Sequence, residues 1–402
     1  MNIVIHPGKL RGIAEIPSSK SYAHRLLIAA ALSDQPTEVR MNALNDDITA
    51  TVGCLRALGA QIDRTATGFR VHPIRKAPRT AELFCGESGS TLRFLIPVAA
   101  ALGVNCTFTG AGRLPERPNL ILTEALGAHG VYADNSFLPM TLSGQLQGGA
   151  YPIAGNVSSQ YITGLLLALP LCDFDSEIVL TTKLESAAYI DITLETLAPF
   201  GIRTERTATG WHIPGGQKYR SPGIVNAEGD WSGAAFWHAA NRIGSSVDCL
   251  GLNENSVQGD RAIASMLSRL GSEINVSDTP DLVPALAVAA AAHPGITRIT
   301  GAARLRIKES DRLRTVADML HALGCSADEL EDGLVIRGGA PFSGCTIDGC
   351  NDHRIVMAAA IAATIADGPV TITDAQAVNK SYPAFFETFN ALGGHSHVES
   401  DR

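Results

Sequence analysis

The stretch Ser18-Ser19-Lys20-Ser21-Tyr22-Ala23-His24-Arg25 places serines and basic residues directly ahead of an apolar run from Leu26 to Leu32. Serines before an Ala/Leu-rich run are typical of a helix N-terminus, where unpaired backbone N–H groups and the positive end of the helix dipole face outward. Lys20 in the first turn and Arg25 in the next would let this helix end bind a doubly charged anion such as a phosphate. A capped helix with solvated charges explains these residues equally well. Evidence from the rest of the chain is needed to choose between this explanation and an anion-binding site.

The same pattern, a small polar or acidic residue ahead of an Ala/Leu-rich helix, recurs along the chain. It occurs near Lys20, Gly89, Ser158, Trp231, Leu282 and Asp352. A second signal, an apolar helix that ends at a glycine and is followed by a short strand-like stretch, recurs at Gly59, Gly127, Gly201, Gly271, Gly324 and Gly393. The glycines are about 70 residues apart, except that 53 residues separate Gly271 from Gly324. Such self-similarity indicates six copies of one supersecondary unit that fill the chain.

Each copy contains one amphipathic helix and one helix that is apolar nearly all round. The apolar helices are predicted at Leu92–Leu102, Tyr161–Leu169, Leu286–Ala292 and Ile355–Ala366. Helices of this kind are buried inside their domain. Three copies can close around three buried helices, so we expect an α/β fold with two similar domains. If all six buried helices point their N-termini at one cleft, anions are attracted there despite the formal net charge of −8.

Composition narrows the class of protein. Hydrophobic residues at 45% and charged residues at 18% describe an ordinary globular chain. No apolar run is long enough to span a membrane, and the first ten residues lack the apolar segment of a signal peptide. The eight cysteines include no CxxC pair, so we expect reduced thiols in the cytoplasm and no protein-built metal site. The net charge of −8 argues against nucleic-acid binding, and any basic cluster should be a local pocket.

Several predicted helix starts carry groups suited to anions. The stretch Gly86-Glu87-Ser88-Gly89-Ser90-Thr91 is a Gly/Ser-rich loop whose backbone N–H groups can approach an anion closely. Ser158-Ser159-Gln160 supplies neutral donors for hydroxyls or for a phosphate. Asp281 precedes an apolar helix, and as its N-cap it would be stabilised in the ionised form.

A further polar stretch, Lys308-Glu309-Ser310-Asp311-Arg312, heads an amphipathic helix. Lys308 and Arg312 are i,i+4 neighbours, and two cations on one face with no acid between them suggest a bound anion. A solvated helix start is the better explanation for Asp311. The Pro-bounded loop Arg113–Pro118 carries two arginines and could close on a ligand, whereas Lys380 ahead of the last helix is weak evidence by itself.

Together, and in this order, these residues resemble the 5-enolpyruvylshikimate-3-phosphate synthase family, also called the 3-phosphoshikimate 1-carboxyvinyltransferases. The motifs that carry the resemblance are Pro17-Ser18-Ser19-Lys20-Ser21, Glu116-Arg117-Pro118, Ser158-Ser159-Gln160, Tyr189-Ile190-Asp191-Ile192-Thr193, Gly229-Asp230, Lys308-Glu309-Ser310-Asp311-Arg312, Asn351-Asp352-His353-Arg354 and Lys380-Ser381-Tyr382-Pro383. The resemblance implies two domains, each of three βαβαββ repeats around buried helices (an inside-out α/β barrel), with the active site in the interdomain cleft. We expect one domain from residues 19–227 and the other from residues 1–18 plus 228–402.

The family transfers the enolpyruvyl group of phosphoenolpyruvate to the 5-hydroxyl of shikimate 3-phosphate and releases phosphate, a step of the shikimate pathway. The resemblance assigns shikimate 3-phosphate to Lys20, Ser21, Arg25, Ser158, Ser159, Gln160, Ser186, Asp281 and Lys308. It assigns phosphoenolpyruvate to Lys20, Gly89, Arg117, Gln160, Arg312, Arg354 and Lys380. Among the catalytic residues, Asp281 would accept the hydroxyl proton, Glu309 would protonate the methylene carbon, and Lys20 would contact both substrates. No cofactor, metal, nucleic acid or membrane is implied, and we expect a monomer.

These residue types suit that chemistry. Two anionic substrates repel each other, so several cations are needed to bring them together. Addition across the enol double bond needs an acid at carbon and a base at the hydroxyl, and a tetrahedral ketal then loses phosphate. Two positions depart from the family pattern: Glu87 replaces a frequent Asn near phosphoenolpyruvate, and Arg304 replaces an Asn that often contacts the shikimate ring. The pocket around Gly89 is intact, so we expect sensitivity to glyphosate, the family's inhibitor.

Three alternatives share related architecture. UDP-N-acetylglucosamine enolpyruvyl transferases usually pair Lys with Asn at the first helix and carry Cys in the mobile loop, whereas this chain has Lys20-Ser21 and no Cys from Gly112 to Pro118. A non-catalytic anion-binding protein of the same fold would not need Asp281 and Glu309. RNA 3′-phosphate cyclase has related repeats, but the net charge of −8 and the lack of a nucleotide motif disfavour it.

Overall fold

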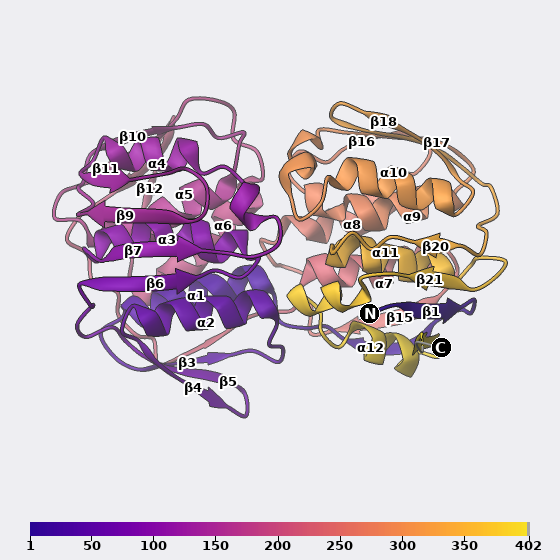
Figure 1. Cartoon of the computed structure of the whole chain (residues 1–402), viewed down its shortest axis with the longest axis horizontal. Helices are drawn as coiled ribbons and strands as arrows, with labels where there is room; N and C mark the ends of the chain where they lie inside the picture. The colour runs from indigo at the N-terminus through magenta and orange to yellow at the C-terminus, as the bar shows by residue number, and fades with distance from the viewer. Residues whose placement is uncertain (400–402) are drawn as a thin grey trace. The chain divides into compact units, whose positions relative to one another are not determined.

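The computed structural model describes residues 1–399, and the chain divides into two compact units (Figure 1). The continuous unit is Ser18–Glu228, and the split unit combines Met1–Pro17 with the described chain from Gly229 onward. Both units mix helices and strands in the same repeating order, so the predicted α/β class with two similar domains is confirmed. No helix within residues 1–399 is long and apolar enough to cross a membrane.

One repeat of the continuous unit shows the complete pattern. Its elements are β6 (Thr80–Phe84), α3 (Gly89–Ala101), β7 (Asn105–Thr109), α4 (Leu120–Gly127), β8 (Val131–Ala133) and β9 (Met140–Gly144). β6 and β7 are parallel, and β9 is antiparallel to both β7 and β8, which gives the strand order β6-β7-β9-β8. Parallel neighbours need a crossover between them, and α3 supplies it.

The other two repeats of this unit follow the same order. One contains β10 (Ala150–Ile153), α5 (Ser159–Ala168), β11 (Ser176–Leu180), α6 (Ala187–Leu197), β12 (Glu205–Arg206) and β13 (Gly210–Ile213). The other contains α1 (Lys20–Leu32), β3 (Thr37–Arg40), α2 (Asp46–Ala57), β4 (Gln61–Thr65) and β5 (Gly68–His72). The first strand of this last repeat is β14 (Ile224–Asn226), which pairs in parallel with β3. The last strand of the unit therefore completes the sheet of its first repeat.

The split unit closes in a similar way. One complete repeat contains β16 (Glu273–Asn275), α9 (Val283–Ala292), β17 (Gly295–Thr300), α10 (Arg312–Ala322), β18 (Ser326–Leu330) and β19 (Gly333–Gly338). Another contains β20 (Thr346–Ile347), α11 (His353–Ala363), β21 (Val370–Ile372), α12 (Phe385–Ala391) and β22 (His395–Val398). Its fourth strand is β1 (Ile3–His6), which lies between β21 and β22.

The fourth repeat of the chain is shorter than the others. It consists of β2 (Arg11–Glu15), α7 (Trp231–Arg242), β15 (Ser246–Leu250) and α8 (Ile263–Leu267), and its sheet has only two strands. The strand predicted after Gly271 is present as β16, which pairs with β17 and begins the next repeat. The missing hairpin accounts for the short spacing in the sequence. At the outer edge of β15, the Asn241 carboxamide bonds to the Val247 N–H at 2.7 Å and the Val247 carbonyl at 2.8 Å, so a side chain occupies part of the missing strand's place.

Each unit is built around three buried helices, α1, α3 and α5 in one and α7, α9 and α11 in the other. The apolar runs in the sequence are these helices, as predicted. Small residues let them approach closely, because a Cβ added to Gly164 of α5 would overlap the Arg93 carbonyl of α3. The bodies of these helices are apolar and buried, so their polar side chains are concentrated at the helix starts.

Candidate active site

The three inner helices of the continuous unit begin with predicted site residues. α1 begins at Lys20 and α3 begins at Gly89, where the Ser88 side chain caps the helix by accepting from Thr91 N at 3.1 Å. α5 begins at Ser159, and Ser158 caps it by accepting from Gln160 N at 3.3 Å. Ser158 is therefore the N-cap of α5, and Ser159, the first residue of the helix, is buried.

Arg25 is buried one turn into α1 and its guanidinium bonds only to neutral oxygens. The acceptors are Thr193 Oγ1 at 2.8 Å, Thr163 Oγ1 at 3.1 Å, the Tyr189 carbonyl at 3.0 Å and the Ser21 carbonyl at 2.7 Å. It also lies over the Phe94 ring, 4.8 Å from the centroid. Burial lowers the pKa of Arg25 to about 9, which still leaves it charged at neutral pH. The charge of Arg25 is therefore available to an anionic ligand.

Lys20 is paired with a carboxylate that the sequence analysis did not single out. Its Nζ lies 2.7 Å from Asp47 Oδ2, in the first turn of α2. Asn45 caps this helix by accepting from Ile48 N at 2.9 Å. The Asn-Asp-Asp run at residues 45–47 was the available signal, because acidic residues concentrate in the first turn of a helix.

Gly89 and Arg117 lie against each other. A Cβ added to Gly89 would lie 3.0 Å from both terminal nitrogens of Arg117, so the guanidinium covers the bare Cα. Arg117 follows the 3₁₀ turn Leu114–Glu116 and is 7% exposed. Its Nε is buried and has no hydrogen-bond partner within residues 1–399. A buried donor without a partner costs free energy, and a carboxylate or phosphate would remove that cost.

Gln160 is held by the neighbouring helix α3. Its carbonyl oxygen accepts from Arg93 Nη1 at 2.8 Å, and its amide nitrogen donates to Ser90 Oγ at 3.0 Å. Arg93 also donates to Asn119 Oδ1 at 3.2 Å. Sequence reasoning missed Arg93, although it follows Gly89 by one helical turn. Glu87, which departs from the family pattern, lies over the backbone of Gly112.

Ser186 has an unusual backbone conformation for a residue with a side chain. It is buried, and its φ of 55° and ψ of 42° place it in the left-handed region at the start of α6. Strain of this kind is concentrated at functional sites. The same helix supplies Thr193 and the Tyr189 carbonyl to Arg25, so Ser186 lies at the start of a helix that holds Arg25. We call the site residues at the starts of α1, α3, α5 and α6 the helix-end cluster of the continuous unit.

In the split unit, Arg312 forms the centre of a network of carboxylates. Its side chain is 1% exposed, and it bonds to Asp281 Oδ1 at 2.9 Å, to Glu309 Oε2 at 2.8 Å and to Asp352 Oδ2 at 2.8 Å. Burial opposes the charge, but Asp352, Glu309 and Asp281 outweigh burial and raise the pKa of Arg312. The prediction that no acid lies between Lys308 and Arg312 is therefore wrong, because Asp281 from a distant segment pairs with both.

Asp281 is surrounded by three cations. Its carboxylate lies 2.9 Å from Arg312, 3.4 Å from Arg354 and 3.5 Å from Lys308. Burial alone would raise its pKa, but Arg354, Lys308 and Arg312 together hold the pKa well below the ordinary value. Asp281 is ionised as expected, yet it is not the N-cap of its helix. It lies in the 3₁₀ turn Pro280–Leu282, and α9 begins at Val283, so side-chain cations stabilise its charge.

The remaining predicted residues of this unit lie at nearby helix ends. Lys308 precedes α10, which begins only at Arg312, so the two do not share a helix face. Asp311 caps α10 by accepting from Arg314 N at 3.3 Å, the structural role favoured by its sequence. Lys380 ends a 3₁₀ segment, is buried, and donates to the Asn351 carbonyl at 2.5 Å.

Two further buried carboxyls were missed as site residues. Asp352 accepts from Ser310 Oγ at 2.8 Å and from Arg354 N at 3.0 Å, and so joins the start of α11 to Arg312. Its place in the Asn-Asp-His-Arg motif was the available signal. Asp260 bonds to Ser232, and burial together with the nearby charge of Asp281 raises the pKa of Asp260 to about 6. Arg304 donates to the Ser277 carbonyl.

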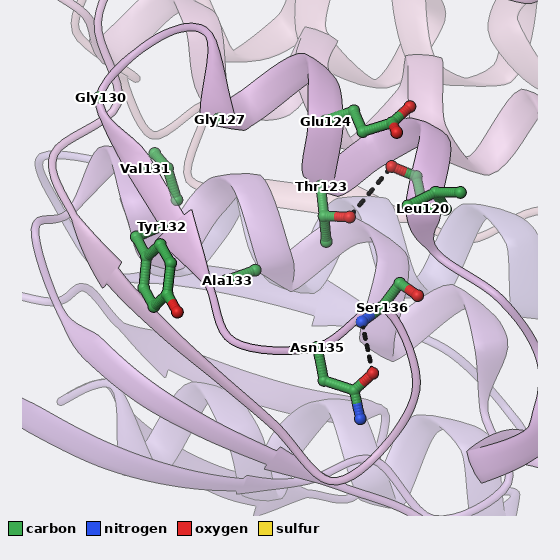
Figure 2. A pocket seen from close by; sticks show the side chains of 10 residues that line it. All are labelled: Leu120, Thr123, Glu124, Gly127, Gly130, Val131, Tyr132, Ala133, Asn135 and Ser136. Atoms are coloured by element: carbon green, nitrogen blue, oxygen red, sulfur yellow. Dashed lines mark hydrogen bonds between the residues drawn. The ribbon is translucent and has the colours of Figure 1, made fainter.

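A hollow of about 530 Å³ lies elsewhere in the continuous unit, beside α4 and β8. Figure 2 shows two local hydrogen bonds in its lining, from Thr123 to the Leu120 carbonyl and from Ser136 N to Asn135. A second hollow of about 520 Å³ borders the same helix. Neither contains a predicted site residue. Among residues 1–399, no three His, Cys, Asp or Glu side chains are arranged to hold a metal ion.

Comparison with known proteins gives consistent matches over the whole chain. A family model described as EPSP synthase (3-phosphoshikimate 1-carboxyvinyltransferase) matches residues 4–279 and 271–389. Relatives from Clostridium kluyveri and Clostridium novyi, each named 3-phosphoshikimate 1-carboxyvinyltransferase, are 40% identical over 98% of this chain and cover 97% and 98% of their own lengths. A solved structure of EPSP synthase from Acinetobacter baumannii has a TM-score of 0.82 at 26% identity, and covers 99% of this chain and 100% of that chain.

Proposed function

The chain belongs to the EPSP synthase (3-phosphoshikimate 1-carboxyvinyltransferase) family, and we propose that its two helix-end clusters hold the two substrates. The enzyme is a transferase of the shikimate pathway, which leads to the aromatic amino acids. It moves the enolpyruvyl (carboxyvinyl) group of phosphoenolpyruvate to the 5-hydroxyl of shikimate 3-phosphate and releases phosphate. UDP-N-acetylglucosamine is not the favoured acceptor.

We assign the phosphate of shikimate 3-phosphate to the continuous unit. The observation that carries this assignment is the buried Arg25 guanidinium, whose hydrogen bonds all go to neutral oxygens. A phosphate would supply the missing negative charge. The neighbouring donors in the assignment are Lys20, Ser21, Ser158, Ser159, Gln160 and Ser186, with Asp281 and Lys308 from the split unit.

We assign the anionic groups of phosphoenolpyruvate to the surroundings of Gly89 and Arg117. The unpartnered Arg117 Nε supports this, because a carboxylate or phosphate would complete its hydrogen bonds. Gln160 is held at the start of α5 by Arg93 and Ser90, and we assign it to the same substrate. Lys20 from this unit and Arg312, Arg354 and Lys380 from the split unit complete the assignment.

Proton transfer falls to the carboxylates of the split unit. Asp281 is a weak base while three cations hold it, and its pKa rises once anionic substrates share those cations. It then takes the proton of the 5-hydroxyl as that oxygen bonds to C2 of phosphoenolpyruvate, while Glu309 gives a proton to the C3 methylene. The ketal then loses phosphate from C2, which leaves with the proton that Asp281 took up, and a proton returns from the methyl group to Glu309, which restores the double bond.

This division of roles requires residues of both units at one site. We therefore propose that the site forms in the interdomain cleft, between a domain of residues 19–227 and a domain of residues 1–18 plus 228–402. We further propose that the enzyme works as a monomer in the cytoplasm. Sedimentation at micromolar concentration gives a single species of one chain if this is right, and a concentration-dependent dimer contradicts it.

Phosphate release tests the reaction directly. The enzyme is mixed with phosphoenolpyruvate and either shikimate 3-phosphate or UDP-N-acetylglucosamine. We expect stoichiometric phosphate release with shikimate 3-phosphate only. Release with the nucleotide sugar would favour the related transferase, and release with neither acceptor would favour a non-catalytic anion-binding protein.

A further inference from the structure

The pairing of Lys20 with Asp47 joins the starts of two helices. The Lys20 side chain is 18% exposed and that of Asp47 is 9% exposed, and Nζ and Oδ2 are 2.7 Å apart. A charge-assisted hydrogen bond of this length is strong where water is largely excluded. A lysine side chain has about 2 kcal/mol of rotamer entropy, so a fixed partner decides where its ammonium lies.

Asp47 is itself fixed to the start of α3. Its backbone carbonyl accepts from Thr91 Oγ1 at 3.3 Å, and that hydroxyl also bonds to Ser88 Oγ at 2.8 Å, the cap of α3. Through Asp47, the position of the Lys20 ammonium is therefore tied to the helix start that carries Gly89. Lys20 and Gly89, two of the groups assigned to phosphoenolpyruvate in this unit, therefore share one support.

A buried chain of polar groups reinforces this support. Thr51 of α2 bonds to Thr91 at 2.7 Å and to His24 Nδ1 at 2.7 Å. Burial, with smaller contributions from Lys20 and Arg25, holds the pKa of His24 well below the ordinary value. The imidazole is therefore neutral at pH 7 and does not compete with Lys20 for the Asp47 charge. α1, α2 and α3 are thus held together by neutral groups around one ion pair.

We propose that Asp47 is a positioning residue for the transfer reaction, which holds the Lys20 ammonium at one point and offsets part of its charge until substrate arrives. The proposal rests on the proposed role of Lys20. Without the carboxylate, Lys20 loses the partner that fixes its ammonium at 2.7 Å and offsets part of its charge. Simple anions should then bind more tightly, while turnover falls because the ammonium is no longer in place for the transition state.

The test compares Asp47→Asn with Asp46→Asn. Both changes remove one negative charge from the first turn of α2, but Asp46 is exposed and is the matched control. For Asp47→Asn we expect kcat to fall by about 30-fold or more, since small misplacements in an active site cost up to about 100-fold. We also expect the Kd of the free enzyme for inorganic phosphate, measured by calorimetry, to fall severalfold. For Asp46→Asn both should stay within about twofold of wild type, as for a surface charge.

A double variant shows whether Lys20 carries the effect. In a Lys20→Met background, Asp47→Asn should leave the phosphate Kd unchanged. The proposal is overturned if Asp47→Asn keeps normal kcat, if it weakens phosphate binding, or if it tightens phosphate equally without Lys20. The calorimetric arm does not depend on turnover. If the wild type released no phosphate from its substrates, the proposed function would fail while the link between Asp47 and Lys20 would still be measured.

Discussion

The two helix-end clusters of this molecule hold buried guanidiniums in opposite ways. In the continuous unit, Arg25 is surrounded by hydroxyl and carbonyl oxygens and keeps its charge unmatched. In the split unit, Arg312 is enclosed by Asp281, Glu309 and Asp352. Both clusters lie at helix ends in copies of one repeating unit. The difference shows that one architecture can surround a buried guanidinium either with neutral oxygens or with carboxylates, depending on a few residues beside each helix.

The largest expected effect is the loss of Arg312. Arg312→Met leaves the buried Asp281 and Asp352 and the partly buried Glu309 without their common partner, and breaking such a network costs about 3–5 kcal/mol of folding free energy. Denaturant unfolding at pH 7 measures this.

The pH dependence provides the control for Arg312→Met. In wild type the pKa values of Asp281 and Asp352 are lowered on folding, so their stabilising contribution is present at neutral pH and lost as pH falls through the folded values. In the variant these carboxyls take up protons more readily. The difference in unfolding free energy between wild type and Arg312→Met should therefore shrink between pH 7 and pH 5. A difference that grows on acidification would contradict the account.

Arg25→Met should behave in the opposite way. Replacing a buried cation that has no acidic partner by an apolar side chain of similar length removes the cost of burying that charge, which is several kcal/mol per ion. The unfolding free energy should therefore hold or rise, while the affinity for shikimate 3-phosphate falls by about 100-fold, in line with about 3 kcal/mol for a hydrogen bond to a charged group. Calorimetric titration and denaturant unfolding give the two numbers. A loss of stability as large as that of Arg312→Met would erase the contrast between the clusters.

The smallest expected effect on folding is that of Gly89→Ala. The new methyl would lie 3.0 Å from the Arg117 guanidinium, the far end of a flexible side chain that can move by a few tenths of an ångström. Stability should change by less than about 1 kcal/mol, whereas KM for phosphoenolpyruvate should rise about tenfold because Arg117 is displaced. Steady-state kinetics with shikimate 3-phosphate saturating provide the measurement. An unchanged KM would separate Arg117 from the phosphoenolpyruvate site.

Local chemistry made the helix starts predictable, and distance along the chain made their partners unpredictable. Caps, glycine stops and apolar runs place α1, α3 and α5 and the sixfold repeat. The contacts Lys20–Asp47 and Arg312–Asp281 join residues 27 and 31 positions apart, and no local pattern fixes which carboxylate meets which cation. The same limit explains why the N-cap role predicted for Asp281 is wrong. Its position in the sequence resembles an N-cap, but its side chain forms ion pairs with three cations from other segments.

The short fourth repeat shows a second limit. The spacing of 53 residues and the strand pattern at residues 272–276 are visible in the sequence, but the sequence does not show to which repeat that strand belongs. In the structure this segment is β16 and begins the next sheet. Strand pairing, which a periodic pattern cannot specify, decides to which repeat a strand belongs.

The division of labour between the two clusters is tested most directly by trapping the ketal in two variants. In a rapid-quench experiment with phosphoenolpyruvate and shikimate 3-phosphate in heavy water, Asp281→Ala should form no ketal while it still binds shikimate 3-phosphate in part, because the base is gone but Arg25 remains. Glu309→Gln should lose deuterium uptake into the C3 methylene carbon. Ketal formation by Asp281→Ala together with normal deuterium uptake by Glu309→Gln would contradict the assignment of proton transfer to the split-unit carboxylates.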